Sequence, residues 1–409
     1  TSQVLASSAY AKYGGGGVGA NYAQTANMGI GVYNIGTTPY TSYSTLGEAY
    51  IQAEYAKTKL KIGRQLFNSP LAGADSGTMI PNLFQGAVLT NTDLPSTKII
   101  AAYFNGFQGG TTNDSASNIN PQTSFSSISR SAFGSYVNNK LATASPIGDT
   151  PMYLFGVSNN SLEVANIEAW YYNNLNAMQM YYLSSDFGFT IASHTPYLSL
   201  QYYGVSAYGS LKSLFNEYAQ TLNAQNTATY VSGVNYNVLG AKLGVETPLG
   251  LTPEVAVNAI SGKNASAYFF NAWGGTPNYS AMGYVGISSF TSYGVSSCVN
   301  PKGATLWNFS LTQNLEYLNF GNKLFKIAYG YYDFLKTSNT LNSNALNTDV
   351  YITDIAFMDK GSLVKNLEVT LLLENIKYAN GWQNLNQTGS ASATASSNNI
   401  IFLRGIYKF

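Results

Sequence analysis

The sequence has little charge and no strong charge imbalance. Asp, Glu, Lys and Arg make up only 10% of the 409 residues, against about a quarter in ordinary soluble proteins. A soluble β-protein would normally place more charge on its exposed faces, where charge keeps strand edges from pairing. The formal net charge is +1, so charge gives no reason to expect nucleic acid or an acidic partner.

Long apolar runs are also missing. No run approaches the roughly 18 residues that a transmembrane helix needs. A chain of this kind could cross a membrane only as a closed β-barrel, because in lipid only helices and closed barrels satisfy the backbone. Residue 1 is threonine, which fits an exported chain that has lost its signal peptide, or a chain whose start lies upstream.

Cysteine and histidine are nearly absent. Cys298 and His194 are single, which excludes an internal disulfide framework and a multi-cysteine metal site. One histidine, followed by Thr-Pro and without a nucleophile motif, leaves little room for triad or metal chemistry. We therefore expect no enzyme activity and no cofactor, and we interpret His194 as structural or surface-exposed. The sequence leaves open whether a calcium ion bridges the loops.

Tyrosine, glycine and small polar residues replace the missing charge. There are 33 tyrosines and 39 glycines, a composition typical of many strands with tight turns and aromatic rings at a membrane interface. Alternation of apolar and polar residues indicates strands throughout, and the last one ends on Phe409. We expect strands at 45–57, 58–66, 86–90, 98–107, 152–158, 163–173, 176–185, 187–193, 196–206, 228–237, 239–247, 254–261, 279–290, 305–316, 323–333, 348–358, 365–378 and 399–409, with further short strands in 1–36.

Connections between these strands alternate between short turns and long loops. The long, weakly periodic loops are expected at 108–150, 264–301 and 383–399, and a short surface helix within 207–227. This alternation is the pattern of an outer-membrane barrel with short periplasmic turns and long extracellular loops. The sequence therefore predicts an all-β, transmembrane antiparallel barrel of about seventeen to twenty strands. It forms a single domain over 1–409, and a first strand upstream of residue 1 is left open.

One stretch, residues 58–90, departs from simple alternation. A strand is followed by residues 67–84, which have no strand period and contain Pro70, Gly73, Gly77 and Pro81. A loop of this length is usually functional or disordered. This one also carries apolar residues that need packing: Leu66, Phe67, Leu71, Met79, Ile80, Leu83 and Phe84. We expect it to hold a shape, fold into the barrel mouth and set the width of a pore.

Charges cluster in the hairpin that precedes this loop. Glu48 and Glu54 fall on the same side as Lys59 and Lys61, and in a barrel that side is the lumen, since lipid does not accept a row of charges. Opposed rows of unlike charge would tune which ions and solutes pass. The alternative is that they are ordinary solvated charges. Arg64 breaks the parity of its strand, so either Gly63 marks a bulge that turns it inward or it sits at the rim.

Residues 59–71, KLKIGRQLFNSPL, and residues 75–94, DSGTMIPNLFQGAVLTNTDL, resemble the corresponding stretch of OprD-type outer-membrane porins, a group that includes the major outer membrane porin and Hof-type proteins. The resemblance implies an 18-stranded barrel in the outer membrane of a Gram-negative bacterium, with inward-folded loops that narrow the channel, often as a trimer. Expected partners are outer-membrane lipid and lipopolysaccharide, further copies in a homotrimer, and small solutes and ions, but no nucleic acid.

The sequence departs from this family at informative positions. The family's loop arginine falls at about Thr78 here, and its glutamate before glycine is Gln85. Some members carry a ladder of arginines along the last strands, whereas the matching inward positions here are Glu368, Thr370, Leu372 and Glu374. Selectivity for basic amino acids through such a ladder is therefore not expected. Asp75 would either bind a cation or cap the loop's own backbone.

We therefore predict a porin for passive diffusion of ions and small hydrophilic solutes, with a water-filled, weakly charge-selective channel. Lys326, Arg404 and Lys408 are expected to face inward near the closing seam, or to pair with Glu368 or Glu374. The alternative function is a surface-exposed structural or adhesin barrel that acts through its long loops. The predicted pore-lining and constriction residues are Glu48, Glu54, Lys59, Lys61, Arg64, Asp75, Thr78, Gln85, Lys326, Glu368, Glu374, Arg404 and Lys408.

Overall fold

The computed structural model describes most of the strand-forming part of the chain. The described residues are 48–74, 82–108, 126–128, 149–213, 235–264, 273, 275, 277–282, 303–333, 349–378, 383–385, 391–393 and 397–407. Among them, no helix has the length and apolar character needed to cross a membrane. The predicted short strands in 1–36 lie outside these residues.

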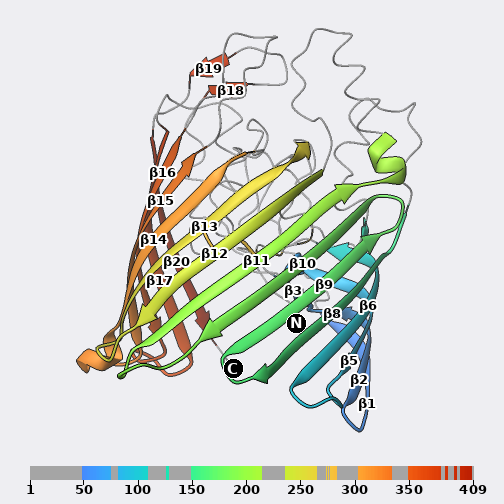
Figure 1. The fold of residues 1–409 in the computed structure, drawn as a ribbon, viewed down its shortest axis with the longest axis horizontal. Coiled ribbons are helices and arrows are strands. Elements are labelled where there is room, and N and C mark those ends of the chain that lie inside the picture. The colour runs from blue at the N-terminus through green and yellow to red at the C-terminus, as the bar shows by residue number, and fades with distance from the viewer. Residues whose placement is uncertain are drawn as a thin grey trace, which may run out of the picture.

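A single antiparallel sheet of 16 strands contains all the long strands, arranged in the order of the chain (Figure 1). The short β7 (Ser126–Ser127) pairs with β6 beside the main path. The path runs through β1 (Ala49–Tyr55), β2 (Thr58–Gln65), β5 (Leu83–Asn91), β6 (Thr97–Gln108), β8 (Met152–Leu162), β9 (Ala165–Asn174), β10 (Met178–Gly188), β11 (Thr195–Ala207), β12 (Asn235–Glu246), β13 (Leu251–Asn264), β14 (Thr305–Asn314), β15 (Lys323–Asp333), β16 (Val350–Lys360), β17 (Leu367–Tyr378) and β20 (Ser397–Tyr407).

The smaller elements lie in the connections. β3 (Asn68–Ser69) pairs with β4 (Ala72–Gly73), and β18 (Gln383–Leu385) pairs with β19 (Ala391–Ala393). The turn between β14 and β15 contains the 3-10 helix η3 (Leu315–Leu318). Figure 1 shows the tilted strands β8–β13 crossing the front of the sheet, with β5 and β6 bending away at one side and β14–β17 at the other.

The all-β prediction is confirmed, and the strand predicted at 323–333 matches β15 residue for residue. Two expected boundaries are wrong. The segments 228–237 and 239–247 were expected to be separate strands, but residues 235–246 form one strand, β12. No strand covers 189–193, because β10 continues to Gly188 and residues 189–194 make the turn into β11. The number of about eighteen strands and the closure of the barrel stay predictions.

The two faces of the sheet differ sharply. One face, here called the uncovered face, exposes large apolar side chains: Tyr103, Tyr153, Phe155, Leu183, Leu200, Leu239, Leu243, Phe309, Leu311, Ile327, Tyr329, Ile355, Leu371 and Leu373. The opposite face, here called the covered face, buries rings together with polar groups: Phe104, Trp170, Tyr172, Tyr203, Tyr236, Ser184, Ser199, Gln201, Asn258, Asn308, Asp354 and Glu374. In a soluble protein, the exposed face of a sheet is mainly polar and the buried face is mainly apolar. The exposed apolar side chains of the uncovered face therefore require an apolar environment.

Candidate functional site

The loop that follows β2 folds back over the covered face. The ring of Phe67 lies 5.0 Å from that of Phe104 on β6 and 6.3 Å from that of Trp170 on β9. Trp170 finds room because Gly156 lies opposite it on β8, where a β-carbon would come within 2.4 Å of the indole ring. The main-chain N–H of Leu71 donates to the hydroxyl of Tyr172 at 3.3 Å. The loop is therefore packed against strands far from it in the sequence.

This loop also holds its own shape. The N–H of Ala74 donates to the carbonyl of Phe67 at 2.8 Å, and the Ser69 hydroxyl donates to the carbonyl of Ala72 at 2.7 Å. Asn82 closes the segment by donating its side-chain N–H to the carbonyl of Gly73 at 3.1 Å. The expectation of a loop with its own packing is thus confirmed for the described residues 67–74, whereas Leu83 and Phe84, which were expected in the loop, begin strand β5.

A pair of glycines lies in the two strands that flank the loop. Gly63 on β2 and Gly86 on β5 lie opposite each other, with φ of +131° and +157°. A β-carbon on Gly86 would come within 1.9 Å of the Tyr103 carbonyl oxygen. The register between β5 and β6 shifts between Gln85 and Gly86, so the bulge lies there.

The bulge at Gly63 that would have turned Arg64 inward is a wrong expectation. The register of β2 against β1 and β5 is continuous through Gly63, and Arg64 lies opposite Gln85 near the end of β2. Because side chains alternate along a strand, Arg64 and Gln85 share the face that carries Leu60 and Ile62. The other expectation, that Arg64 sits at the rim, stays a prediction.

A second segment, Asn278–Met282, crosses the covered face of β11 and β13–β15. Asn278 accepts a hydrogen bond from the Tyr203 hydroxyl at 2.5 Å. Ser280 donates both its N–H and its hydroxyl to Asn258 Oδ1, at 2.8 Å each. The carbonyl of Ser280 accepts from the Tyr332 hydroxyl at 3.0 Å. These contacts come from different strands, so the segment is held along its length.

The two segments meet at Trp273. The N–H of Gly73 donates to the Trp273 carbonyl at 2.9 Å, and the indole N–H of Trp273 donates to the carbonyl of Ile128 at 3.0 Å. Both Trp273 and Ile128 are fully buried. Three different connections therefore join over the covered face. We refer to Phe67–Gly73 as the first inner segment, and to Trp273 with the described residues 277–282 as the second.

This junction corrects two expectations about the long loops. The loop 108–150 was expected to be exposed, yet Ile128 is buried against Trp273. A strand was expected at 279–290 with loops on either side, but Tyr279–Met282 is not a strand and packs on the sheet. Local sequence gave no sign of this, because the positions of both loops depend on contacts with distant strands. Residues 283–290 lie outside the described residues.

The charged hairpin β1–β2 is internally paired. Lys59 lies 3.3 Å from Glu54, and Lys61 lies 3.1 Å from Glu48. Glu48 also accepts from the N–H of Leu66, at 3.1 Å, which ties it to the start of the inner loop. Partial burial alone would raise the pKa of the Glu48 carboxyl, but the Leu66 N–H and the Lys61 ammonium outweigh burial and hold that pKa below its ordinary value.

A charged cluster that the sequence analysis did not identify lies on β11–β13, in the middle of the strand order. Lys242 on β12 and Glu254 on β13 approach to 3.9 Å, and the Tyr197 hydroxyl donates to Glu254 at 2.6 Å. The Lys242 ammonium also lies 5.1 Å from the ring centre of Tyr279 in the second inner segment. Alternation in 239–246 places Lys242 opposite in parity to Leu239 and Leu243, so the signal for an inward lysine was present in the sequence.

For the remaining predicted site residues, the structure gives mainly their partners across neighbouring strands. Lys326 on β15 lies opposite Thr312 and Ala356, and it shares the face of the buried Ala328. Glu374 lies opposite Asp354, and both are buried on the covered face. The backbone of Arg404 lies opposite Thr370, and Glu368 lies opposite Lys360. Asp75, Thr78 and Lys408 lie outside the described residues, and the pore-lining roles stay predictions.

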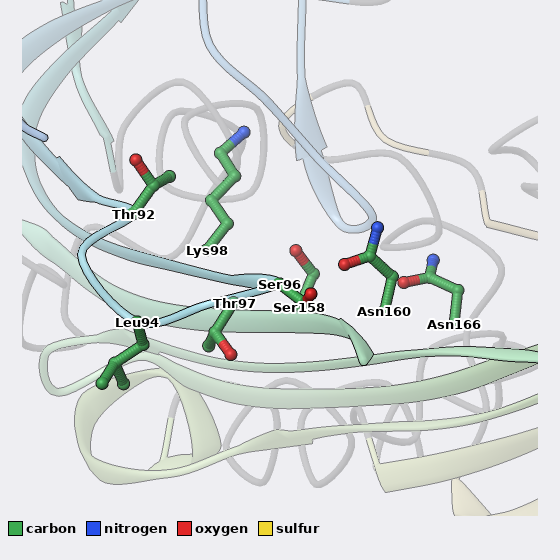
Figure 2. A pocket seen from close by; sticks show the side chains of 8 residues that line it. All are labelled: Thr92, Leu94, Ser96, Thr97, Lys98, Ser158, Asn160 and Asn166. Atoms are coloured by element: carbon green, nitrogen blue, oxygen red, sulfur yellow. The ribbon is translucent and has the colours of Figure 1, made fainter. Parts of the chain in front are cut away.

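A shallow pocket of about 290 Å³ lies at the turns that join β5 to β6 and β8 to β9. Figure 2 shows Lys98, Asn160 and Asn166 on one side of the ribbon and Leu94 and Thr97 on the other. It is distant in the sheet from the junction at Trp273 and contributes none of the residues described above. Within the described residues, no three His, Cys, Asp or Glu side chains are grouped to hold a metal ion.

Residues 20–228, half of the chain, match the family model described as outer membrane porin, OprD family. The chain belongs to the OprD family of outer-membrane porins. It is therefore an outer-membrane protein of a Gram-negative bacterium, and its channel passes small solutes. In a porin of this family, the covered face is expected to be the inner wall of the channel and the uncovered face the one that contacts lipid.

Solved structures share the fold at low sequence identity. OccK9 (OpdG) of Pseudomonas aeruginosa is 12% identical, with a TM-score of 0.59 over 91% of this chain and 78% of that one. OccK5 (OpdH) of the same organism is 13% identical, with a TM-score of 0.60 over 90% and 83%. OpdK of P. aeruginosa, crystallised with vanillate, is 12% identical, with a TM-score of 0.59 over 88% and 80%. No curated protein matches the chain.

Proposed function

We propose that this porin is a passive diffusion channel whose narrowest part is formed by the two inner segments and whose charge selectivity is weak. The observation that carries the proposal is the junction at Trp273, where the N–H of Gly73 meets the Trp273 carbonyl at 2.9 Å. Segments that meet over the inner wall take up cross-section that would otherwise be open to water. The width of the channel then depends on side chains at that junction.

The inner wall carries both signs of charge, which supports weak rather than sharp selectivity. Lys59 and Lys61 are each matched by a glutamate within the hairpin, and Lys242 lies near Glu254. Fixed charges that neutralise one another locally leave little net field for passing ions. The channel works without catalysis or a cofactor in this proposal. Lipopolysaccharide contacts and a homotrimer remain proposals as well.

Single-channel recording in planar lipid bilayers tests this function. The wild-type protein should open ion-conducting channels, and Trp273→Ala should raise the conductance of each channel, because it removes the indole that ties the second inner segment to Ile128. The matched control is Trp307→Ala. Trp307 stacks on Phe309 at 6.2 Å on the lipid-facing side, so its loss should leave conductance unchanged.

Two results would contradict the proposal in different ways. A folded, membrane-inserted preparation without channel activity would overturn the function itself. Trp273→Ala channels with wild-type conductance would leave the porin function standing and overturn the assignment of the constriction to the inner segments.

A further inference from the structure

We propose that Lys242 is a specificity-determining residue of the channel and that Tyr279 is the positioning residue that keeps its charge directed toward passing ions. The inference deepens the proposed function and rests on it. Charge selectivity then originates mainly on the wall formed by β11–β13, where Tyr279 of the second inner segment meets Lys242 on β12, and not in the β1–β2 hairpin.

The position of Lys242 is suited to this role. It lies on the inner face of β12, opposite Ser199 on β11 and Ala256 on β13, in the half of β12 that leads into the turn to β13. Its side chain keeps 28% of its surface exposed, so the ammonium is neither buried nor fully solvated. A charge on the wall of a narrow channel acts on ions that pass within several ångströms.

Two aromatic rings flank the Lys242 ammonium. The centre of the Tyr279 ring lies 5.1 Å from the Lys242 nitrogen, and that of Tyr197 lies 5.7 Å away. Both distances fall within the range of about 6 Å over which a cation is attracted to the face of a ring. The rings hold the charge without neutralising it, because they carry none of their own.

The nearest carboxylate is only loosely paired with this lysine. Glu254 Oε2 lies 3.9 Å from the Lys242 nitrogen, whereas the Tyr197 hydroxyl donates to the same oxygen at 2.6 Å. The Tyr197 hydroxyl thus lies closer to this oxygen than the lysine does. By comparison, Lys61 and Glu48 in the hairpin lie 3.1 Å apart, so that lysine is the better neutralised of the two.

The other charged groups that act on these two rings are acidic. Tyr279 interacts electrostatically with Asp186 on β10, and Tyr197 interacts with Glu254 and with Glu246 on β12. This part of the wall would favour cations if it carried carboxylates alone. Lys242 is the cation that opposes them, so it keeps the preference weak.

Tyr279 can position Lys242 because its own backbone is fixed. The neighbouring Ser280 donates twice to Asn258 and accepts from Tyr332, and Asn278 accepts from Tyr203. Without the Tyr279 ring, the long lysine side chain is free to swing toward Glu254 and form a closer ion pair. The inner segment therefore contributes to the charge of the channel although Asn278–Met282 has no charged residue.

Reversal potentials measured across a bilayer under a KCl gradient test the inference. Lys242→Gln should raise the permeability ratio of K⁺ to Cl⁻ by roughly two- to fivefold, as expected for one charge a few ångströms from the ion path. Tyr279→Leu should shift the ratio in the same direction by less. Lys242→Arg keeps the charge and should match the wild type. Tyr279→Phe keeps the ring but loses the hydroxyl that donates to the Leu200 carbonyl at 3.3 Å, so it should shift the ratio less than Tyr279→Leu does. Lys365→Gln, in the exposed turn after β16, is the control for charge removal outside the channel.

The double variant Lys242→Gln, Tyr279→Leu separates positioning from an independent effect of the ring. If Tyr279 acts through Lys242, the double variant should equal Lys242→Gln alone. Additive shifts would overturn the positioning role. If Lys242→Gln channels had wild-type selectivity, the inference would be overturned and the porin function would stand. If neither the wild type nor any variant formed channels, the proposed function itself would be overturned.

Discussion

The β1–β2 hairpin and the wall formed by β11–β13 hold their charges in different ways. In the hairpin, two lysines and two glutamates pair across adjacent strands at 3.1 and 3.3 Å. On the other wall, Lys242 lies 3.9 Å from its carboxylate and is flanked by two rings, one of them from an inner segment that approaches from outside the sheet. Lys61 in the hairpin also lies over a ring, that of Tyr50 at 3.6 Å, so the two regions differ in the distance between lysine and carboxylate. The hairpin has more charge along its length, yet the second wall presents its charge with less local neutralisation. Counting charges along a strand therefore misjudges what a passing ion experiences.

The largest expected effect comes from detaching the first inner segment. Phe67 is 6% exposed and packs its ring against Phe84, Phe104 and Trp170. Phe67→Ala should lower the free energy of unfolding by about 3–5 kcal/mol, as buried phenylalanines do, and should raise single-channel conductance. Urea titration followed by tryptophan fluorescence measures the first quantity. Phe155→Ala, whose ring is 49% exposed on the lipid-facing side, should leave conductance unchanged, and an increase equal to that of Phe67→Ala would contradict the assignment of the two faces.

A smaller effect is expected at Gly86, beside the bulge between β5 and β6. Gly86 has φ of +157°, and an added β-carbon would meet the Tyr103 carbonyl oxygen at 1.9 Å. Gly86→Ala should cost about 1–3 kcal/mol, the usual range for strained backbone, and thermal unfolding in detergent measures it. Gly188→Ala is the control, because nothing lies within 4 Å of its added β-carbon. Equal melting temperatures for the two variants would show that the backbone at Gly86 does not require glycine.

The smallest expected effect concerns the hairpin itself. The pKa of Glu48 is lowered in the folded protein, so its stabilising contribution is present above its unfolded pKa and is lost as pH falls through its folded pKa. Because Glu48 and Lys61 are partly exposed, Glu48→Gln should cost less than about 1 kcal/mol near neutral pH. The cost should vanish in acid. Unfolding titrations at several pH values measure this difference, and a cost that grew on acidification would contradict the ion pair.

Local patterns in the sequence predicted the strands well but not the course of the inner segments. Alternation depends on neighbours along one strand, so β15 and the pairing of Glu54 with Lys59 were accessible from sequence. The position of Trp273 depends on Ile128, 145 residues away, and that of Leu71 on Tyr172, 101 residues away. Such contacts arise only after the sheet has curved, and no local period encodes them.

Part of the candidate site could likewise be predicted from local sequence patterns, and part could not. Lys242 and Glu254 were accessible from alternation within their strands, because both fall on the face opposite the lipid-facing leucines. Tyr279 was not, because it lies in a stretch without charge or period, where a strand was expected. The sequence thus indicates which charges line the wall, while the inner segment that positions one of them follows from contacts between distant parts of the chain.

Thiol modification at position 279 tests most directly whether the inner segments lie in the conducting path. Tyr279→Cys channels, made in a Cys298→Ser background, would be treated in a bilayer with a positively charged methanethiosulfonate reagent. Leu239→Cys, on the lipid-facing side, is the control and receives the same treatment. We expect a stepwise fall in conductance and a shift toward anion permeability for Tyr279→Cys alone. Complete labelling of Tyr279→Cys with conductance and selectivity unchanged would contradict the account.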